Sequence, residues 1–189
     1  MRAHIKPTHQ IQRINSLLNR LEEFKTQDRK TFMIRPTEKA WSGAEVLKHM
    51  IIAHGVYEEK VENALLKLKP VNEEVDVVST RAIPSFLIKR FPPKDGKIRF
   101  KMKTMKTFKP MLDVNELSEN DVNDLLTEMQ KTLNQLSSWV EQTRKNDVLP
   151  IRFNSAVGAI VKFNASEACE FILCHNERHF QQLTNTISS

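Results

Sequence analysis

Glycine and cysteine are both scarce in this chain of 189 residues. Its 4 glycines are too few for a turn-rich β-sandwich or for a glycine-rich nucleotide-binding protein. The 2 cysteines, Cys169 and Cys174, fall in one predicted helix, where side chains five positions apart point about 140° apart around the axis. We therefore expect no disulfide between them, which favours a cytoplasmic location.

Long hydrophobic runs are also missing. No stretch approaches the ~18 apolar residues that would suggest a membrane span. The first ten residues, MRAHIKPTHQ, lack the apolar run of a signal peptide. We expect no membrane span and, from the length, a single domain over residues 1–189.

The positive charge is concentrated in one segment. Residues 94–110 hold seven basic residues and one acidic residue, which accounts for the whole net charge of +6. One interpretation is a solvated loop or hairpin, and another is a wall that draws an anionic substrate toward a site. A third is a nucleic-acid or anionic-surface binder with Phe100 and Phe108 interleaved among the basic residues. Nucleic-acid binding is not favoured, because the remaining residues sum to zero charge.

Apolar residues spaced three and four apart predict four long amphipathic helices. Their ranges are 8–27, 42–68, 118–146 and 164–187. The second begins at a capping box formed by Ser42 and Glu45. A shorter helix is possible over 83–91, and residues 97–103 alternate as in a strand. The pattern predicts an all-α, up-and-down-like four-helix bundle with a long connection, 70–117, between its second and third helices.

Two histidines occupy positions of the last helix where leucines would be expected. His175 and His179 lie four residues apart in CHNERHFQQL (174–183), so they share one face. His49 lies on the inward stripe of the second helix. Three inward histidines from two helices could hold a metal and leave coordination positions open, as catalytic sites do. The alternative is that all three are core histidines hydrogen-bonded to backbone or water.

The same helical geometry predicts where the residues around these histidines lie. His54 is rotated about 140° from His49 and is predicted at the surface or rim. Cys174 is turned away from the histidines, and Glu177 and Arg178 are predicted outside the inward face. Gln182, three residues after His179, could form a hydrogen bond behind that ligand. No carboxylate shares the inward stripe, so a carboxylate-bridged di-iron centre is not predicted.

The sequence W-S-G-A-E-V-L-K-H (41–49), followed far downstream by H-N-E-R-H-F-Q-Q-L (175–183), resembles the DinB-like superfamily, including its YfiT-like members. The resemblance spans most of the chain. It implies a four-helix bundle that forms a homodimer. It also implies a divalent metal bound by His49, His175 and His179, zinc or nickel in the first place. Iron and manganese also accept imidazole ligands.

The resemblance further implies a metal-dependent enzyme acting on a small-molecule substrate. It would be a hydrolase that activates water, or an S-transferase that uses a low-molecular-weight thiol. No motif in the sequence decides between the two. Two alternatives stay open: a non-enzymatic binding or assembly bundle with structural histidines, and a nucleic-acid or anionic-surface binder through residues 94–110.

Overall fold

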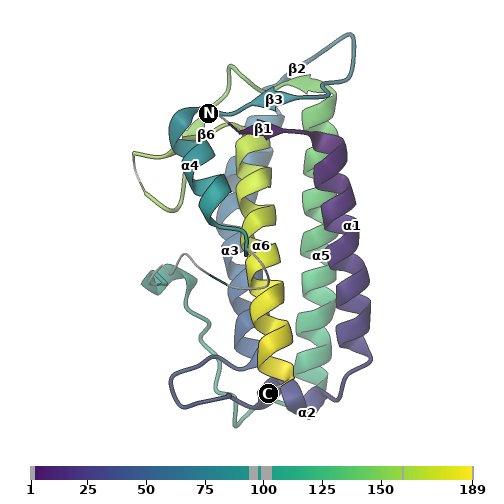
Figure 1. Ribbon diagram of the computed structural model, residues 1–189, viewed down its shortest axis with the longest axis vertical. Helices are drawn as coiled ribbons and strands as arrows, with labels where there is room; N and C mark the ends of the chain where they lie inside the picture. Colours follow the sequence, from purple (N-terminus) through teal and green to yellow (C-terminus); the bar gives the residue numbers. More distant parts are fainter. Residues whose placement is uncertain (1–2, 94–97, 99–103, 159, 189) are drawn as a thin grey trace.

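Helices make up most of the described chain (Figure 1). The computed structural model describes residues 3–93, 98, 104–158 and 160–188. The long helices are α1 (Pro7–Lys25), α3 (Gly43–Leu65), α5 (Glu119–Arg144) and α6 (Ala165–Ile187). The short ones are α2 (Arg29–Met33), α4 (Ala82–Arg90) and a 3-10 turn, η1 (Lys106–Phe108). The all-α prediction is confirmed, although α2 lies where a connection without helix was expected.

Three of the long helices begin at a reciprocal capping box. In α3 the Ser42 side chain accepts a hydrogen bond from the backbone N–H of Glu45, and the Glu45 carboxylate accepts one from the backbone N–H of Ser42. Equivalent pairs begin α5 and α6. These caps satisfy backbone donors that a helix start leaves without partners. They also fix where α3 and α6 begin, and hence which way their histidines point.

The four long helices lie side by side, and short strand pairs show how they run (Figure 1). Strand β2 (Lys69–Pro70), just after α3, pairs with β4 (Asn146–Asp147), just after α5, so α3 and α5 end together and run parallel. Helices α1 and α6 run the opposite way. The up-and-down-like order predicted from the sequence is therefore wrong between the second and third long helices, which run parallel. The connection from α3 to α5 returns along the whole length of the molecule, and α4 and η1 lie on this return path.

Two further antiparallel pairs hold the ends of the connections. Strand β1 (His4–Ile5) pairs with β3 (Val78–Ser79), and β5 (Phe153–Asn154) pairs with β6 (Lys162–Phe163). The strand expected over 97–103 lies largely outside the described residues.

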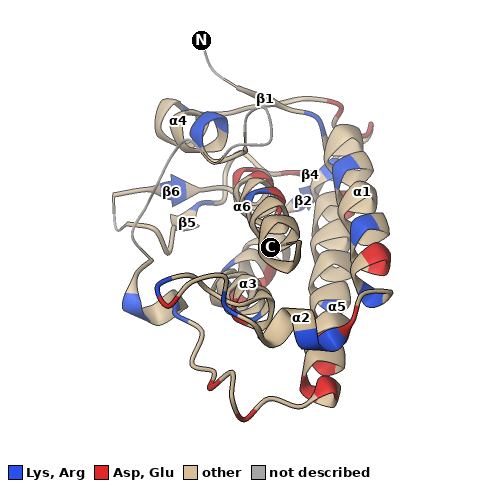
Figure 2. Cartoon of the chain, turned by 60° about the horizontal axis from the view of Figure 1, so that its bottom comes forward, with Lys and Arg blue, Asp and Glu red and all other residues tan. Residues whose placement is uncertain are grey.

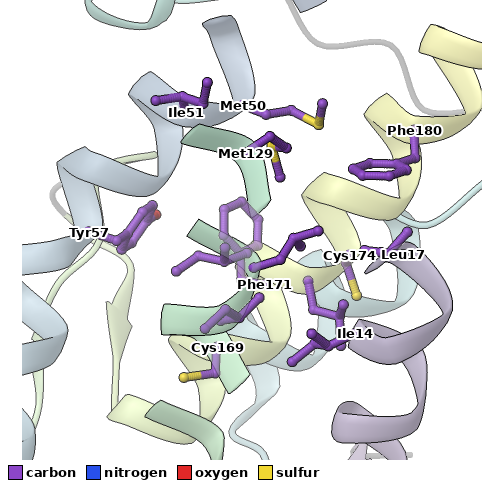
Figure 3. Packing of buried hydrophobic residues seen from close by; sticks show 14 of the residues in the cluster. Ile14, Leu17, Met50, Ile51, Tyr57, Met129, Cys169, Phe171, Cys174 and Phe180 are labelled. Carbon is purple, nitrogen blue, oxygen red and sulfur yellow. The ribbon is translucent and has the colours of Figure 1, made fainter. Parts of the chain in front are cut away.

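The core is filled by apolar side chains from all four long helices (Figure 3). Ile14 from α1, Met50 from α3 and Met129 from α5 are fully buried there. Cys169 and Cys174 point to different parts of this core and form no disulfide, as expected. Burial raises the pKa of both thiols, so neither is predisposed to act as a thiolate.

Lys, Arg, Asp and Glu positions on α1 and α5 lie mainly on the side of each helix that is turned away from the rest of the bundle (Figure 2). This matches the amphipathic pattern from which the helices were predicted. Within the described residues, no helix combines the length and the apolar character needed to cross a membrane.

Candidate metal centre

His49 of α3 meets His175 and His179 of α6. One nitrogen from each lies within 4.8 Å of the other two, and the Nε2 atoms of His49 and His175 are 3.2 Å apart. Two nitrogens bound to one tetrahedral zinc at roughly 2.0–2.1 Å would lie about 3.3–3.4 Å from each other. The structure thus brings the predicted residues together with a spacing that suits a shared metal.

Hydrogen bonds fix the tautomers of two of these histidines. Nδ1 of His49 is 2.6 Å from the backbone carbonyl oxygen of Phe108. Nδ1 of His179 is 2.9 Å from Oε1 of Gln182. Both oxygens can only accept, so each Nδ1 carries the proton and each Nε2 keeps its lone pair. This is the arrangement that orients metal-ligating histidines in known sites, and the expected contact from Gln182 is present.

The surroundings keep all three imidazoles neutral near neutral pH. Burial lowers the pKa of His49. Burial, followed by the proximity of His49 and Arg178, lowers the pKa of His175 to about 3. Burial and the neighbouring histidines hold the pKa of His179 well below its usual range. Neutral imidazole is the form that ligates a metal.

The cluster lies in the wall of a pocket between α3 and α6. Phe91, after α4, and Phe108, in η1, add walls from the return path. The remaining described lining residues are Ala53, His54, Tyr57, Thr104, Met105, Val157, Phe171, Ile172 and Arg178. Most of these are apolar, and none is an aspartate or a glutamate. A small molecule in this pocket would therefore contact the histidines in largely apolar surroundings.

The structure places two further side chains, Trp41 and Arg178, near the cluster. The ring of Trp41 packs on His49, with centroids 4.9 Å apart. Arg178 was predicted outside the inward face, yet it lines the pocket, and its guanidinium lies over the ring of Phe91, 5.6 Å from the centroid. Arg178 follows His175 by three residues, a spacing that places helical side chains close together. The sequence alone could therefore have indicated that Arg178 lies near the histidines. Glu177 does lie outside, where it pairs with Arg13 of α1.

The prediction for His54 was wrong. Its side chain is 2% exposed and stacks on Trp139 of α5, with ring centroids 4.6 Å apart and planes 7° apart. Its Nε2 is 2.9 Å from Oε1 of Gln135. The prediction assumed one buried face on the second helix, whereas α3 packs against both α5 and α6 and buries two.

Two other expectations concern residues around the cluster. Cys174 faces away from the histidines, as expected, because its sulfur lies 3.4 Å from the Glu170 carboxylate and 3.5 Å from the Arg13 guanidinium. Phe108 was considered as an aromatic for nucleic-acid stacking, but its ring is buried, so that part of the interpretation is wrong. Phe100 and most of the basic residues in 94–110 lie outside the described residues.

Comparison with known proteins adds no relative. No protein-family model, no curated protein and no solved structure matches the chain. The DinB-like resemblance therefore rests on the quoted motifs alone and stays a prediction. The evidence for function is therefore the chemistry of the site itself, in which three neutral imidazoles lie at the wall of a mostly apolar pocket.

Proposed function

We propose that the chain is a DinB-like four-helix bundle that binds one divalent metal through His49, His175 and His179 and acts as a metal-dependent enzyme. The observation that carries this proposal is the convergence of the three imidazoles, two of them held in the tautomer that ligation through Nε2 requires. A divalent metal held this way supplies Lewis acidity, which makes water or a thiol a better nucleophile near neutral pH and polarises a substrate oxygen.

The protein residues have separate roles in this proposal. The histidines bind the metal, while the Phe108 carbonyl and Gln182 orient two of them. Phe91 and Phe171 form apolar walls that exclude water and strengthen polar interactions inside the pocket. Three protein ligands leave at least one coordination position for the substrate or nucleophile.

The substrate in this proposal is a small molecule. The reaction is hydrolysis if water occupies the open position, or S-transfer if a low-molecular-weight thiol does. Imidazole ligands suit zinc and nickel, and also iron, while manganese accepts them less readily. A homodimer, which follows from the resemblance, and a cytoplasmic location, which follows from the two free cysteines, are part of the same proposal.

One observation favours the alternative that the protein is a non-enzymatic binding or assembly bundle. The 3.2 Å separation between Nε2 of His49 and Nε2 of His175 also suits a direct hydrogen bond, in which one ring donates and the other accepts. The same cluster could then be a polar contact within a structural or binding bundle. Metal content separates the two readings.

The test is elemental analysis of the purified chain without a histidine-rich tag. The parent is compared with His175→Ala and with His9→Ala, a control that removes an exposed histidine of α1. We expect about one equivalent of metal in the parent and in the His9→Ala control, and a clear loss in His175→Ala. No bound metal after reconstitution with zinc, nickel, manganese and iron(II) would refute the site.

Catalysis is tested separately with the metal-loaded protein. Ester and amide hydrolysis are screened beside the conjugation of small thiols to electrophiles. Turnover that follows metal content across the parent, His175→Ala and His9→Ala proteins would support an enzyme. Full metal occupancy without turnover in either screen would favour the binding or assembly alternative.

A further inference from the structure

Arg178 brings a positive charge into the pocket that holds the three histidines. It is half-buried in α6, three residues after His175 and one before His179. No aspartate, glutamate or lysine is present among the described lining residues. The described lining therefore carries a net positive charge before any metal is considered, and a divalent metal on neutral imidazoles would increase it.

The guanidinium acts on the site at close range. It lies over the ring of Phe91, another lining residue, at 5.6 Å from the centroid. Its charge contributes to lowering the pKa of His49, His175 and His179. Burial also lowers the pKa of Arg178 itself. This half-buried guanidinium can therefore act electrostatically on an anion that enters the pocket.

The rest of the lining suits an apolar molecular body. Phe91, Phe108 and Phe171 contribute aromatic rings, while Val157 and Ile172 contribute aliphatic groups. Electrostatic attraction is stronger beside such surfaces than in water. Among its described lining residues, the pocket therefore combines the arginine Arg178 with side chains that favour contact with apolar groups.

We propose that Arg178 binds the carboxylate of the substrate, so that the pocket selects small carboxylates with an apolar body. This inference rests on the proposed function, because it names the substrate class of the same site. Guanidinium matches a carboxylate through two parallel N–H···O bonds. Among the described lining residues Arg178 supplies one guanidinium and no lysine is present, which suits a carboxylate monoanion better than a phosphate dianion, because the dianion generally requires more donors. Arg178 and the histidines lie on neighbouring positions of α6, so one small molecule can reach both.

The test compares two probes of nearly the same shape, phenylacetate and its neutral analogue phenylacetamide. Binding of each is titrated by NMR or calorimetry against metal-free and zinc-treated protein. The parent is compared with Arg178→Gln, Arg178→Lys and Arg90→Gln. Arg90 is a matched control, because its guanidinium lies over Phe86 at 4.5 Å and neither residue is among the described lining residues.

We expect the parent to prefer phenylacetate by about tenfold or more, the range of a charge-assisted hydrogen bond. Arg178→Gln should abolish the preference, Arg178→Lys should retain part of it, and Arg90→Gln should leave it unchanged. Equal binding of the two probes to the parent would overturn the inference, as would a preference that persists in Arg178→Gln. The comparison on the parent requires no variant to fold.

The metal-free arm separates this inference from the proposed metal site. A parent that takes up no metal, yet prefers phenylacetate through Arg178, would refute the metal proposal and keep the carboxylate site. A parent that takes up metal without preferring phenylacetate in either state would keep the metal site and refute the role of Arg178. The two failures are therefore distinguishable.

Discussion

The backbone carbonyl oxygen of Phe108 accepts a 2.6 Å hydrogen bond from Nδ1 of His49, a residue 59 positions earlier in the sequence. This contact joins η1 to the first half of α3 and makes the return path between α3 and α5 part of the candidate site. It also fixes the His49 tautomer through the backbone, which a side-chain substitution at Phe108 alters only indirectly. The orientation of one proposed ligand thus depends on the connection between α3 and α5 and not on a neighbouring long helix.

Gln182 has the corresponding role for His179, and here the side chain itself can be tested. Gln182→Ala removes the acceptor of the 2.9 Å contact with Nδ1 and leaves all three histidines in place. We expect metal affinity to fall about 10- to 100-fold, the usual effect of losing such a partner. The measurement is competition with a chromophoric chelator. Gln181→Ala is the matched control, because Gln181 bonds to exposed Asn185; an equal loss in both variants would refute the role of Gln182.

The buried histidines predict how stability depends on pH in the metal-free protein. The pKa of His175 is about 3 in the folded chain, and the pKa values of His49 and His179 are lowered in the same direction. In the unfolded chain a histidine titrates near ~6.5. Unfolding therefore takes up protons below about pH 6.5, and the free energy of unfolding falls as the pH falls, with the contribution of His175 ending near pH 3.

Denaturant titrations of chelator-treated protein between pH 7 and pH 4 measure this dependence. We expect His175→Gln to have a shallower fall in stability toward acid than the parent, because it lacks one of the groups that take up protons. His9→Gln should follow the parent, since His9 is exposed. Identical slopes in the parent and His175→Gln would contradict the buried, neutral state assigned to His175.

Helical periodicity was enough to predict the long helices and to single out the three histidines that the structure brings together. The four predicted ranges correspond to α1, α3, α5 and α6, because capping boxes and inward stripes are local properties of the chain. His175 and His179 were placed together by their four-residue spacing. That His49 reaches them from another helix required the tertiary packing of α3 on α6.

The surroundings of the site were harder to predict, for a different physical reason. A stripe on a helical wheel indicates one buried face, but α3 packs on two neighbours, so His54 was wrongly placed at the rim. The contact between Phe108 and His49 uses a backbone oxygen, and any residue type could supply it. Such a contact cannot be recognised from the composition of the sequence or from the spacing of its residue types. Arg178 was misplaced because its position lies outside the inward stripe of the helix, although its spacing from His175 allows the long side chain to line the pocket.

Two arginine–carboxylate pairs at helix starts each join a partly exposed arginine to a buried glutamate, and this predicts that both contribute to stability. Arg81 pairs with Glu167 in the capping box of α6 at 2.6 Å, and the Glu167 side chain is fully buried. Arg81→Gln would leave that carboxylate without its cation. We expect a loss of about 2 kcal/mol, below the usual 3–5 for a broken buried pair because the Arg81 side chain is partly exposed.

Arg35 pairs at 2.6 Å with Glu45 in the capping box of α3, where the arginine side chain is 40% exposed and the glutamate side chain 5% exposed. Arg35→Gln should therefore cost a similar amount, about 2 kcal/mol, because it too leaves a buried carboxylate without its cation. Chemical denaturation of both variants measures the two losses. A loss below about 0.5 kcal/mol in either variant would show that solvent screens the pair although its carboxylate is buried.

Two glycines of α3 should respond in opposite ways to alanine. Gly55 is exposed in the middle of the helix, and an added Cβ would meet no atom within 4 Å. Gly55→Ala should raise the free energy of unfolding by up to about 1 kcal/mol, the difference in helix propensity. At Gly43 an added Cβ would lie 3.1 Å from the Cα of Phe32 and 3.2 Å from Cγ2 of Ile187.

The crowding at Gly43 involves backbone, which cannot move aside as a flexible side chain can. Gly43→Ala should therefore lower stability by separating the start of α3 from α2 and from the end of α6, with a cost in the overpacking range of roughly 1–3 kcal/mol. Thermal unfolding of the two variants beside the parent measures both effects, since 1 kcal/mol corresponds to about 2–4 °C for a chain of this size. A melting temperature that rises in both variants would show that the close approach of Phe32 at Gly43 relaxes without cost. Because α3 and α6 carry the three histidines, a loss at Gly43 should also weaken metal binding, whereas Gly55→Ala should leave it unchanged.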